Sequence, residues 1–238
     1  GRWLTANGVI ALLPANTVND DDIEIYTDES RLQVALTWRN LRQQSVRPVV
    51  DGVMRPNRSL ADFIAPKDSG VADYIGMFAV TAGLGVDVKE KQFEKDHDDY
   101  SAIMLKALAD RFAEAFAEAL HARVRRDLWG YANAETLSND ELIAEKYRGI
   151  RPAPGYPACP DHLVKRDMFD VLQANEIGMT VTESLAMLPA ASVSGFYLAH
   201  PDSTYFSVGK IGQDQLEDYA QRMSLSKADA ERALAPLL

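Results

Sequence analysis

Hydrophobic residues in the first third of the chain fall into short runs separated by turn-forming residues. An uninterrupted apolar run over residues 9–13, ended by a proline, predicts a buried strand, and alternating acidic and apolar residues over 22–26 predict a half-buried one. Residues 34–38 and 74–80 are rich in strand-forming residues and predict two more strands. Residues 45–58 contain prolines, a glycine and several arginines, which predicts an exposed loop.

The pattern changes to a helical period from about residue 90 to residue 128. No glycine or proline interrupts this segment, and apolar residues recur every three or four positions, which predicts one apolar face along a long helix. That face comprises Tyr100, Ile103, Met104, Ala107, Leu108, Phe112, Phe116 and Leu120. Asp110, Glu114 and His121 fall away from it, beside small alanines that would let a second body approach closely.

The second half of the chain predicts shorter elements. Ser138 begins a capping-box sequence and therefore a short helix, and residues 163–174 have a helical pattern. Residues 192–199 and 205–211 indicate two strands joined as a hairpin, and two amphipathic helices separated at 224–227 close the chain. Strands at both ends flank a long helix without regular alternation. The predicted class is therefore α+β rather than a doubly wound nucleotide-binding fold.

Composition and charge limit the possible partners. The chain has 238 residues, 47% of them hydrophobic, so it can bury a sizeable core and is not disordered. Its net charge of -10 argues against binding to nucleic acid or to an anionic membrane surface, because both require an excess of cationic side chains. The charge suits a small cationic ligand or a basic partner, although a simply acidic surface is the plainer explanation.

The single cysteine, Cys159, excludes an intrachain disulfide and hence a disulfide-stapled secreted scaffold. No clearly paired base accompanies it, so a packed residue is favoured over a reactive thiol. No apolar run reaches the roughly 18 residues of a membrane helix, and the chain starts without a signal sequence. We therefore expect a cytoplasmic protein.

Common catalytic and metal-binding signatures are absent from the sequence. It contains no Gly-x-x-x-x-Gly-Lys-Ser/Thr, His-Glu-x-x-His or Gly-x-Ser-x-Gly motif. Residues 20–22 are three aspartates without the glycine of a calcium loop, which indicates a solvated turn. Residues 96–99 include metal-ligand types, but adjacent helix positions point in different directions, so the start of a helix is favoured. No metal site is predicted.

Residues 151–160 read Arg-Pro-Ala-Pro-Gly-Tyr-Pro-Ala-Cys-Pro, and we call this segment the proline turn. Four prolines exclude both a helix and an interior strand, and a stiff turn loses little entropy on binding a ligand. Arg151 offers a charged fork for a carboxylate, Gly155 permits close approach to the backbone, and Tyr156 adds a flat face. A preformed small-molecule pocket and a structural proline corner with Arg151 in an ion pair both remain open.

Two acids bear on the choice between these interpretations. Glu114 lies on the helix face away from the apolar stripe, and Glu145 precedes Arg151 by six residues. If both approach the turn, they favour a positively charged ligand. The alternative is that each is a solvated helix acid.

The proline turn, extended to His162, strongly resembles the signature of the C-terminal activation domain of cobalamin-dependent methionine synthase. Further matching segments follow in the family's order along nearly the whole chain. They are residues 60–66, 73–76, 97–100, 106–118, 129–131, 191–195, 200–203 and 218–220. The resemblance implies a C-shaped single domain over residues 1–238, with a twisted antiparallel sheet, a long central helix and flanking helices.

The resemblance also implies a function in methionine biosynthesis. In that family the domain binds S-adenosylmethionine (AdoMet) and docks on a separate domain that holds cobalamin. An electron from a flavodoxin-like donor and the AdoMet methyl group then restore methylcobalamin from inactive cob(II)alamin. The parent enzyme is a methyltransferase, but this chain alone is not expected to make methionine, and no acid–base catalyst is expected.

The resemblance assigns roles to residues of the proline turn and to two aromatic residues. Arg151 matches the arginine that holds the ligand's carboxylate. The backbones of Ala153 and Gly155 and the side chain of Tyr156 match the rest of the cradle. An aromatic pair of the ligand site corresponds to Tyr205 and Phe206, where we expect Tyr-Tyr in relatives.

Three acids also receive roles by resemblance. Glu114 and Glu145 match acids near the positive charge of the ligand, and Asp110 matches an acid on the side that meets the cobalamin domain. In the family a stretch before the first strand supplies an aspartate for the adenine end. This chain begins after that stretch, so we expect weaker adenosine recognition.

Two other functions remain open at this point. One is an AdoMet-sensing or corrinoid-protein docking module without methyl transfer, and the other is a structural remnant that has lost its ligand. The retained proline turn argues against the remnant. In each case the chain is expected to be a monomer.

Overall fold

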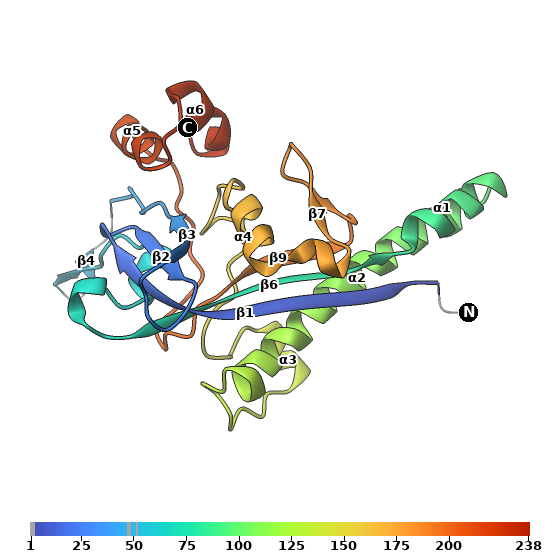
Figure 1. Ribbon diagram of the computed structural model, residues 1–238, viewed down its shortest axis with the longest axis horizontal. Coiled ribbons are helices and arrows are strands. Elements are labelled where there is room, and N and C mark those ends of the chain that lie inside the picture. The colour runs from blue at the N-terminus through green and yellow to red at the C-terminus, as the bar shows by residue number, and fades with distance from the viewer. Residues whose placement is uncertain (1–2, 47–48, 51) are drawn as a thin grey trace. The chain divides into compact units, whose positions relative to one another are not determined.

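Five strands form the main sheet of the computed structural model, which describes residues 3–46, 49–50 and 52–238. The strand order is β3-β2-β1-β6-β9, and the pairs β1–β2, β2–β3 and β6–β9 are antiparallel (Figure 1). The strands are β1 (Thr5–Val18), β2 (Asp22–Tyr26), β3 (Val34–Arg39), β6 (Asp73–Leu84) and β9 (Ser192–Tyr197). The predicted positions of β2, β3, β6 and β9 are confirmed.

Two short antiparallel pairs are separate from this sheet. They are β4 (Val49–Val50) with β5 (Val53–Met54), and β7 (Thr180–Val181) with β8 (Met187–Leu188). The first pair lies within the loop predicted over residues 45–58, of which residues 47, 48 and 51 lie outside the described residues.

The described residues form six α-helices beside these strands, and the predicted α+β class is confirmed. They are α1 (Val86–Lys95), α2 (Asp99–Arg123), α3 (Asn139–Ile143), α4 (Val164–Leu172), α5 (Gln213–Arg222) and α6 (Lys227–Ala233). The one helix predicted from about residue 90 to 128 is instead α1, α2 and a π-helical turn, Val124–Leu128. Between α1 and α2, His97 has φ +58°, and Asp98 caps α2 by accepting a hydrogen bond from the Ser101 N–H (3.0 Å).

The chain divides into two compact units. Unit 1 comprises Gly1–Ala11, Gly76–Tyr147 and Lys165–Tyr197, and unit 2 comprises Leu12–Ile75, Arg148–Val164 and Leu198–Leu238. Strands β1 and β6 therefore each contribute residues to both units. The single domain predicted over residues 1–238 stays a prediction.

In unit 1, helix α2 buries its small residues rather than its large ones. It packs against β9 and α1, and its buried positions are Ala102, Leu105, Ala109, Ala113, Ala117 and His121. Several large apolar residues of the predicted face have exposed fractions of 41% to 74%. They are Tyr100, Ile103, Met104, Leu108 and Phe112. The alanine face was expected to be open to a second body, and its partners include the chain's own strand β9.

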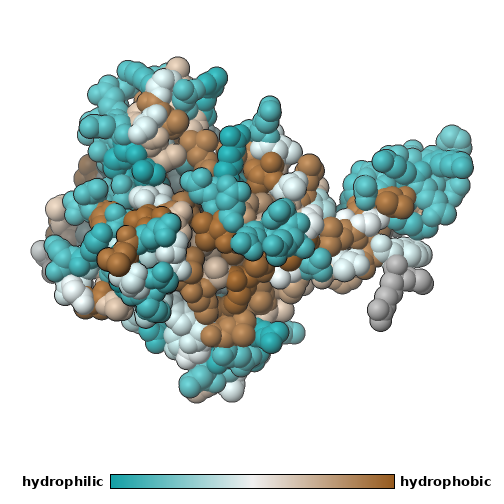
Figure 2. Space-filling view, viewed as in Figure 1, coloured by the Kyte–Doolittle hydropathy of each residue, from teal (hydrophilic) through white to brown (hydrophobic). Residues whose placement is uncertain are grey.

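Side-chain size explains which face of α2 is buried. An alanine projects a single carbon, so an alanine face can pack closely against neighbouring strands and fill the interface without voids. Gly8 on β1 also permits close packing, because a Cβ there would lie 3.0 Å from both Phe116 and Val80. Hydrophobic residues consequently reach the molecular surface, as Figure 2 shows.

A buried ion pair follows α2 in unit 1. Arg125 in the π-helical turn is fully buried, and its Nε donates to both carboxylate oxygens of Glu135 (3.1 and 2.9 Å). A terminal nitrogen donates a further hydrogen bond to Glu135 (2.7 Å), and the guanidinium lies 4.3 Å from the centre of the Tyr147 ring. Beside this turn the His121 ring stacks on the Tyr197 ring, with 5.0 Å between the ring centroids. The pair thus joins the end of α2 to the segment that follows it.

In unit 2, strand β1 continues through Pro14 to Val18, so the predicted strand end at this proline is wrong. The β1–β2 register begins with Ala15 opposite Ile25, and the missing N–H of Pro14 therefore interrupts none of these pairs.

The turn at residues 20–22 is also less solvated than predicted. Asp21 pairs with Arg42 (2.9 Å), and Asp22 is buried and pairs with Arg222. Burial raises the pKa of both carboxyl groups above the usual range, and the arginines oppose this shift. Ion pairing compensates the cost of removing these carboxylates from water.

The hairpin predicted from residues 192–199 and 205–211 does not form. Residues 205–211 contain no strand, and their backbone groups pair elsewhere in unit 2. The Val208 N–H donates to the Pro157 carbonyl (2.9 Å), and the Ile211 N–H donates to the Leu237 carbonyl (3.1 Å). These hydrogen bonds take the place of the ladder that was predicted between residues 205–211 and β9.

The C-terminal part of unit 2 has its own hydrophobic cluster. Helices α5 and α6 pack on each other (Figure 1), as their predicted amphipathic patterns require. The buried members of this C-terminal cluster are Leu41, Val208, Leu216, Tyr219, Ala220, Ala230, Leu234 and Leu237. Figure 2 shows mostly hydrophilic residues on the outer surface of this helix pair.

Among the described residues, no helix combines the length and the apolar character that crossing a membrane requires. Within the same residues, no three histidine, cysteine or acidic side chains are grouped to hold a metal ion.

Candidate functional site

Backbone hydrogen bonds within the proline turn contribute to its shape. The Gly155 N–H donates to the Cys159 carbonyl (2.7 Å), the Cys159 N–H donates to the Tyr156 carbonyl (2.9 Å), and the Tyr156 N–H donates to the Ala153 carbonyl (3.2 Å). Just before the turn, Ile150 exchanges two hydrogen bonds of 3.0 Å with Leu198. The turn therefore begins directly after a paired residue and folds back on itself, as its four prolines predict.

Residues 205–208 run beside the proline turn, and we call them the strap. The Tyr205 hydroxyl accepts a hydrogen bond from the Arg151 N–H (3.0 Å), and Val208 donates to Pro157. The amide of Gln43 donates to the Ser207 carbonyl (2.6 Å). The strap thus contacts the turn at Arg151 and at Pro157. Tyr205 and Arg151, two predicted site residues, lie in direct contact.

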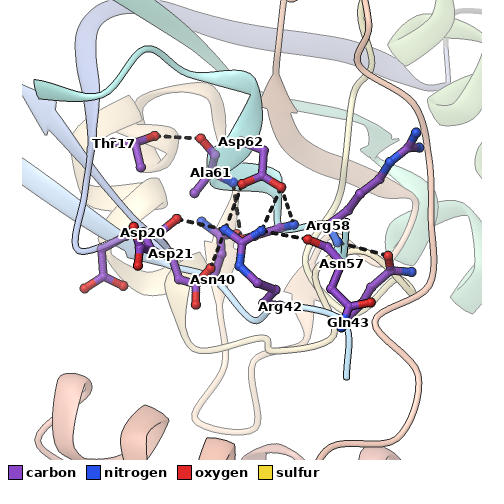
Figure 3. A network of polar contacts seen from close by, with 12 residues as sticks. Thr17, Asp20, Asp21, Asn40, Arg42, Gln43, Asn57, Arg58, Ala61 and Asp62 are labelled. Atoms are coloured by element: carbon purple, nitrogen blue, oxygen red, sulfur yellow. Dashed lines mark hydrogen bonds and ion pairs between the residues drawn. The ribbon is translucent and has the colours of Figure 1, made fainter. Parts of the chain in front are cut away.

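Gln43 connects the strap to a polar network (Figure 3). Its side-chain carbonyl accepts from the Arg58 N–H (3.1 Å). The neighbouring Arg42 donates to both carboxylate oxygens of Asp62 (2.7 and 2.9 Å) and to the backbone carbonyls of Asp20 and Asn57. Because one guanidinium ties these segments together, the strap rests on a rigid part of unit 2.

The far end of the proline turn rests on a buried carboxylate. Asp161 accepts hydrogen bonds from the Leu163 N–H (2.9 Å) and from the Tyr219 hydroxyl of α5. Burial raises the pKa of the Asp161 carboxyl, and these hydrogen bonds oppose that shift. Burial also raises the pKa of Tyr219, with the Asp161 charge adding to the effect. The tyrosine therefore remains a neutral donor at ordinary pH. Cys159 is buried beside them, as predicted for a packed residue.

Gly155 leaves space for a neighbouring ring. Its φ is +94°, and an added Cβ would lie 2.0 Å from Cε1 of His162. A side chain at this position would have to displace the imidazole. The structure therefore gives its own reason for a glycine at this position: the His162 ring packs against the turn. The predicted approach of a ligand to Gly155 stays a prediction.

We expect Gly155→Ala to destabilise the fold by about 1 kcal/mol more than Gly70→Ala. Both glycines have positive φ, but an added Cβ at Gly70 meets no atom within 4 Å. Urea unfolding measures the two free energies. With His162→Ala introduced into both variants the difference should disappear, whereas equal costs without it would contradict the steric role of the ring.

The predicted site residues divide between the two units. Arg151, Ala153, Gly155, Tyr156, Tyr205 and Phe206 all belong to unit 2. Tyr156 is 61% exposed, so it is accessible to a ligand. Phe206 is partly buried and packs against the C-terminal cluster, which fixes the strap from behind.

The three acids belong to unit 1. Glu114 is exposed on α2, and Glu145 is exposed just after α3 with φ +53°. Asp110 is also exposed on α2 and lines a cavity of about 510 Å³, largely apolar, together with Lys106 and Pro189. Their predicted roles toward a ligand or a partner stay predictions.

Sequence reasoning did not assign roles to Asp161, Tyr219, Gln43 or His162. Asp161 and His162 close the extended proline-turn motif, and Tyr219 lies within the matching segment 218–220. The sequence therefore showed these motifs, but it did not show which contacts their residues make. Asp161 and Tyr219 are 58 positions apart, a separation at which no periodicity predicts a hydrogen bond.

Comparison with known proteins adds to this geometry. The family model described as vitamin B12 dependent methionine synthase, activation domain, matches residues 1–224. A solved structure described as the crystal structure of the MetH reactivation domain bound to AdoHcy has 55% sequence identity and a TM-score of 0.94. The match covers 100% of this chain and 71% of that one.

The α+β fold is thus that of a known class of reactivation module. The chain belongs to the family of activation domains of vitamin B12-dependent methionine synthases. The fold and family expected from the sequence are confirmed. The parent enzymes of this family are methyltransferases.

Proposed function

We propose that this chain binds AdoMet at the proline turn and takes part in reactivating a cobalamin-dependent methionine synthase. The observation that carries the proposal is the contact of Arg151 and Tyr205, which joins the proline turn to the strap in a single cradle. The MetH reactivation domain with 55% identity was solved with AdoHcy, the product that AdoMet leaves after losing its methyl group. We propose that this chain binds the same kind of ligand.

Within this cradle Arg151 would bind the carboxylate of the ligand. A guanidinium fork matches a carboxylate with two parallel hydrogen bonds. The backbones of Ala153 and Gly155 would contact the amino-acid part, and the exposed ring of Tyr156 would cover the ligand. Gly155 suits this role because a residue without a side chain permits close approach to its backbone.

The other predicted residues supply aromatic surface and negative charge. Tyr205 would contact the ligand from the strap, while Phe206 would act mainly by fixing the strap, because its ring packs in the C-terminal cluster. Glu114 and Glu145 would favour the positive charge of the sulfonium or amino group. These two assignments rest on the family resemblance.

The proposed chemistry needs orientation rather than proton transfer. AdoMet supplies the methyl group, and cobalamin held by a separate domain of the parent enzyme receives it. The residues of this chain would bind the ligand and hold its reactive end in place. The chain by itself is therefore not expected to make methionine.

Docking and electron supply complete the proposal. Asp110 would contribute to the surface that meets the cobalamin domain, and a flavodoxin-like protein would supply the electron. We expect the chain to act as a monomer in the cytoplasm.

Isothermal titration calorimetry with AdoMet and AdoHcy tests the proposed function. We expect saturable binding of both ligands at one site. Adenosine is the matched control, because it lacks the carboxylate that Arg151 would bind, and it should bind far more weakly. A folded chain that binds neither AdoMet nor AdoHcy would refute the proposal.

A further inference from the structure

Tyr219 has two roles in unit 2. Its ring is fully buried in the C-terminal cluster, and its hydroxyl leaves that cluster to donate a hydrogen bond to Asp161. The residue therefore joins helix α5 directly to the end of the proline turn.

Asp161, which directly follows the proline turn, connects Tyr219 to it. One of its carboxylate oxygens accepts the Tyr219 hydroxyl, and the other accepts the Leu163 N–H. The Cys159 thiol lies 3.9 Å from the Asp161 carbonyl oxygen. A carboxylate that is only 7% exposed needs hydrogen-bond donors, so losing the hydroxyl would force the turn to rearrange or admit water.

A second connection runs from the same cluster to the same turn. Val208 is a buried member of the C-terminal cluster, and its N–H donates to the Pro157 carbonyl. Helix α5 thus supports the turn through Asp161 and through the strap. The turn has no helix or strand of its own, so its shape depends on such contacts.

We propose that Tyr219 is a positioning residue for the ligand cradle: its hydrogen bond to Asp161 holds the proline turn in the binding shape before a ligand arrives. The inference rests on the proposed AdoMet function and deepens it. A preordered turn loses less conformational entropy on binding, and this saving appears directly as affinity. Tyr219 acts through the turn and does not itself contact the ligand.

Tyr219→Phe removes the hydroxyl and keeps the ring in the cluster. We expect the affinity for AdoHcy, measured by calorimetry, to fall about tenfold, because one buried hydrogen bond that orders the turn is lost. Asp161→Asn is a conservative variant that should keep the contact with Tyr219. Its amide can donate to the Tyr219 hydroxyl while its carbonyl accepts from Leu163, so its affinity should stay near that of the unaltered chain.

Tyr26→Phe is the matched control. Tyr26 is a buried tyrosine of unit 2 on β2, and its hydroxyl donates to Glu24 (2.8 Å), which lies outside the proline turn and the strap. The substitution deletes the same atom, and we expect less than about a twofold change in affinity. An equal loss in both variants would point to general loosening of unit 2 and overturn the proposal.

Hydrogen exchange gives a readout that does not depend on the ligand. The Gly155, Cys159 and Val208 amides each donate a hydrogen bond in or onto the turn, and the β6–β9 amides report on the sheet. Tyr219→Phe should accelerate exchange at the three turn amides, relative to the sheet, and Tyr26→Phe should not.

The two readouts separate the two proposals. If AdoHcy fails to bind the unaltered chain, the proposed function fails, while faster exchange in Tyr219→Phe still supports the positioning of the turn. If AdoHcy binds, and Tyr219→Phe changes neither its affinity nor turn exchange, the positioning role is overturned and the function stands. Should Tyr219→Phe prove too unstable, Asp161→Ala removes the same contact from the other side and takes its place.

Discussion

Arg151→Ala should weaken AdoHcy binding at least about 100-fold, which corresponds to roughly 2.7 kcal/mol. The substitution removes a charged fork and leaves the carboxylate of the ligand without its partner, and hydrogen bonds to charged groups are the most costly to lose. Arg151→Lys should recover only part of the affinity, because an ammonium cannot form two parallel hydrogen bonds. Calorimetry on the folded variants measures both effects.

Arg148→Ala is the matched control for this experiment. Arg148 lies three residues before Arg151, is exposed, and donates to the Ala199 carbonyl (3.1 Å). Its removal changes the net charge by the same amount, so any general electrostatic effect appears in both variants. If the two substitutions lowered the affinity equally, Arg151 would have no specific role in binding the ligand.

Glu135→Ala should destabilise the fold by about 3–5 kcal/mol, the largest effect on stability that we expect. The substitution leaves Arg125, whose side chain is 0% exposed, with an unpaired charge in the interior of unit 1. Urea unfolding at neutral pH measures the loss. Replacing both partners together, as in Arg125→Met with Glu135→Leu, should cost less than Glu135→Ala alone, because no buried charge then remains.

Glu90→Ala provides the exposed counterpart of that experiment. Glu90 pairs with Lys106 at 2.6 Å, but the lysine side chain is 52% exposed and its charge stays hydrated. We expect a cost of about 0–1 kcal/mol. A similar cost for Glu90→Ala and Glu135→Ala would show that burial of Arg125 carries no penalty, contrary to the expectation.

The helical pattern of residues 100–120 correctly indicated a helix but not the face that packs. Hydrophobicity alone favoured the large residues, whereas the structure buries Ala109, Ala113 and Ala117 against its neighbours. Amphipathic patterns assume that the apolar side is the inner side. Close packing against the sheet requires small side chains. The periodicity of the sequence does not contain this requirement, because it arises only from the tertiary structure.

The hairpin predicted around His200 failed for a related reason. Residues 205–211 have the composition of a strand, but their backbone groups pair with Pro157, Gln43 and Leu237 instead of β9. Backbone groups need partners, and the sequence does not say which distant partner lies nearest. The error mattered for the site, because the strap carries Tyr205 to Arg151.

The sequence by itself determined the class of fold, the family and the proline turn, because prolines, capping residues and long motifs act locally or by resemblance. Only the tertiary structure decided what holds that turn in place. The partners of Asp161, Gln43 and Arg125 depend on how the chain folds back on itself, and the two ends of the Asp161–Tyr219 contact are 58 residues apart. Burial then turns each of these contacts from a weak surface interaction into one that the fold cannot lose without cost.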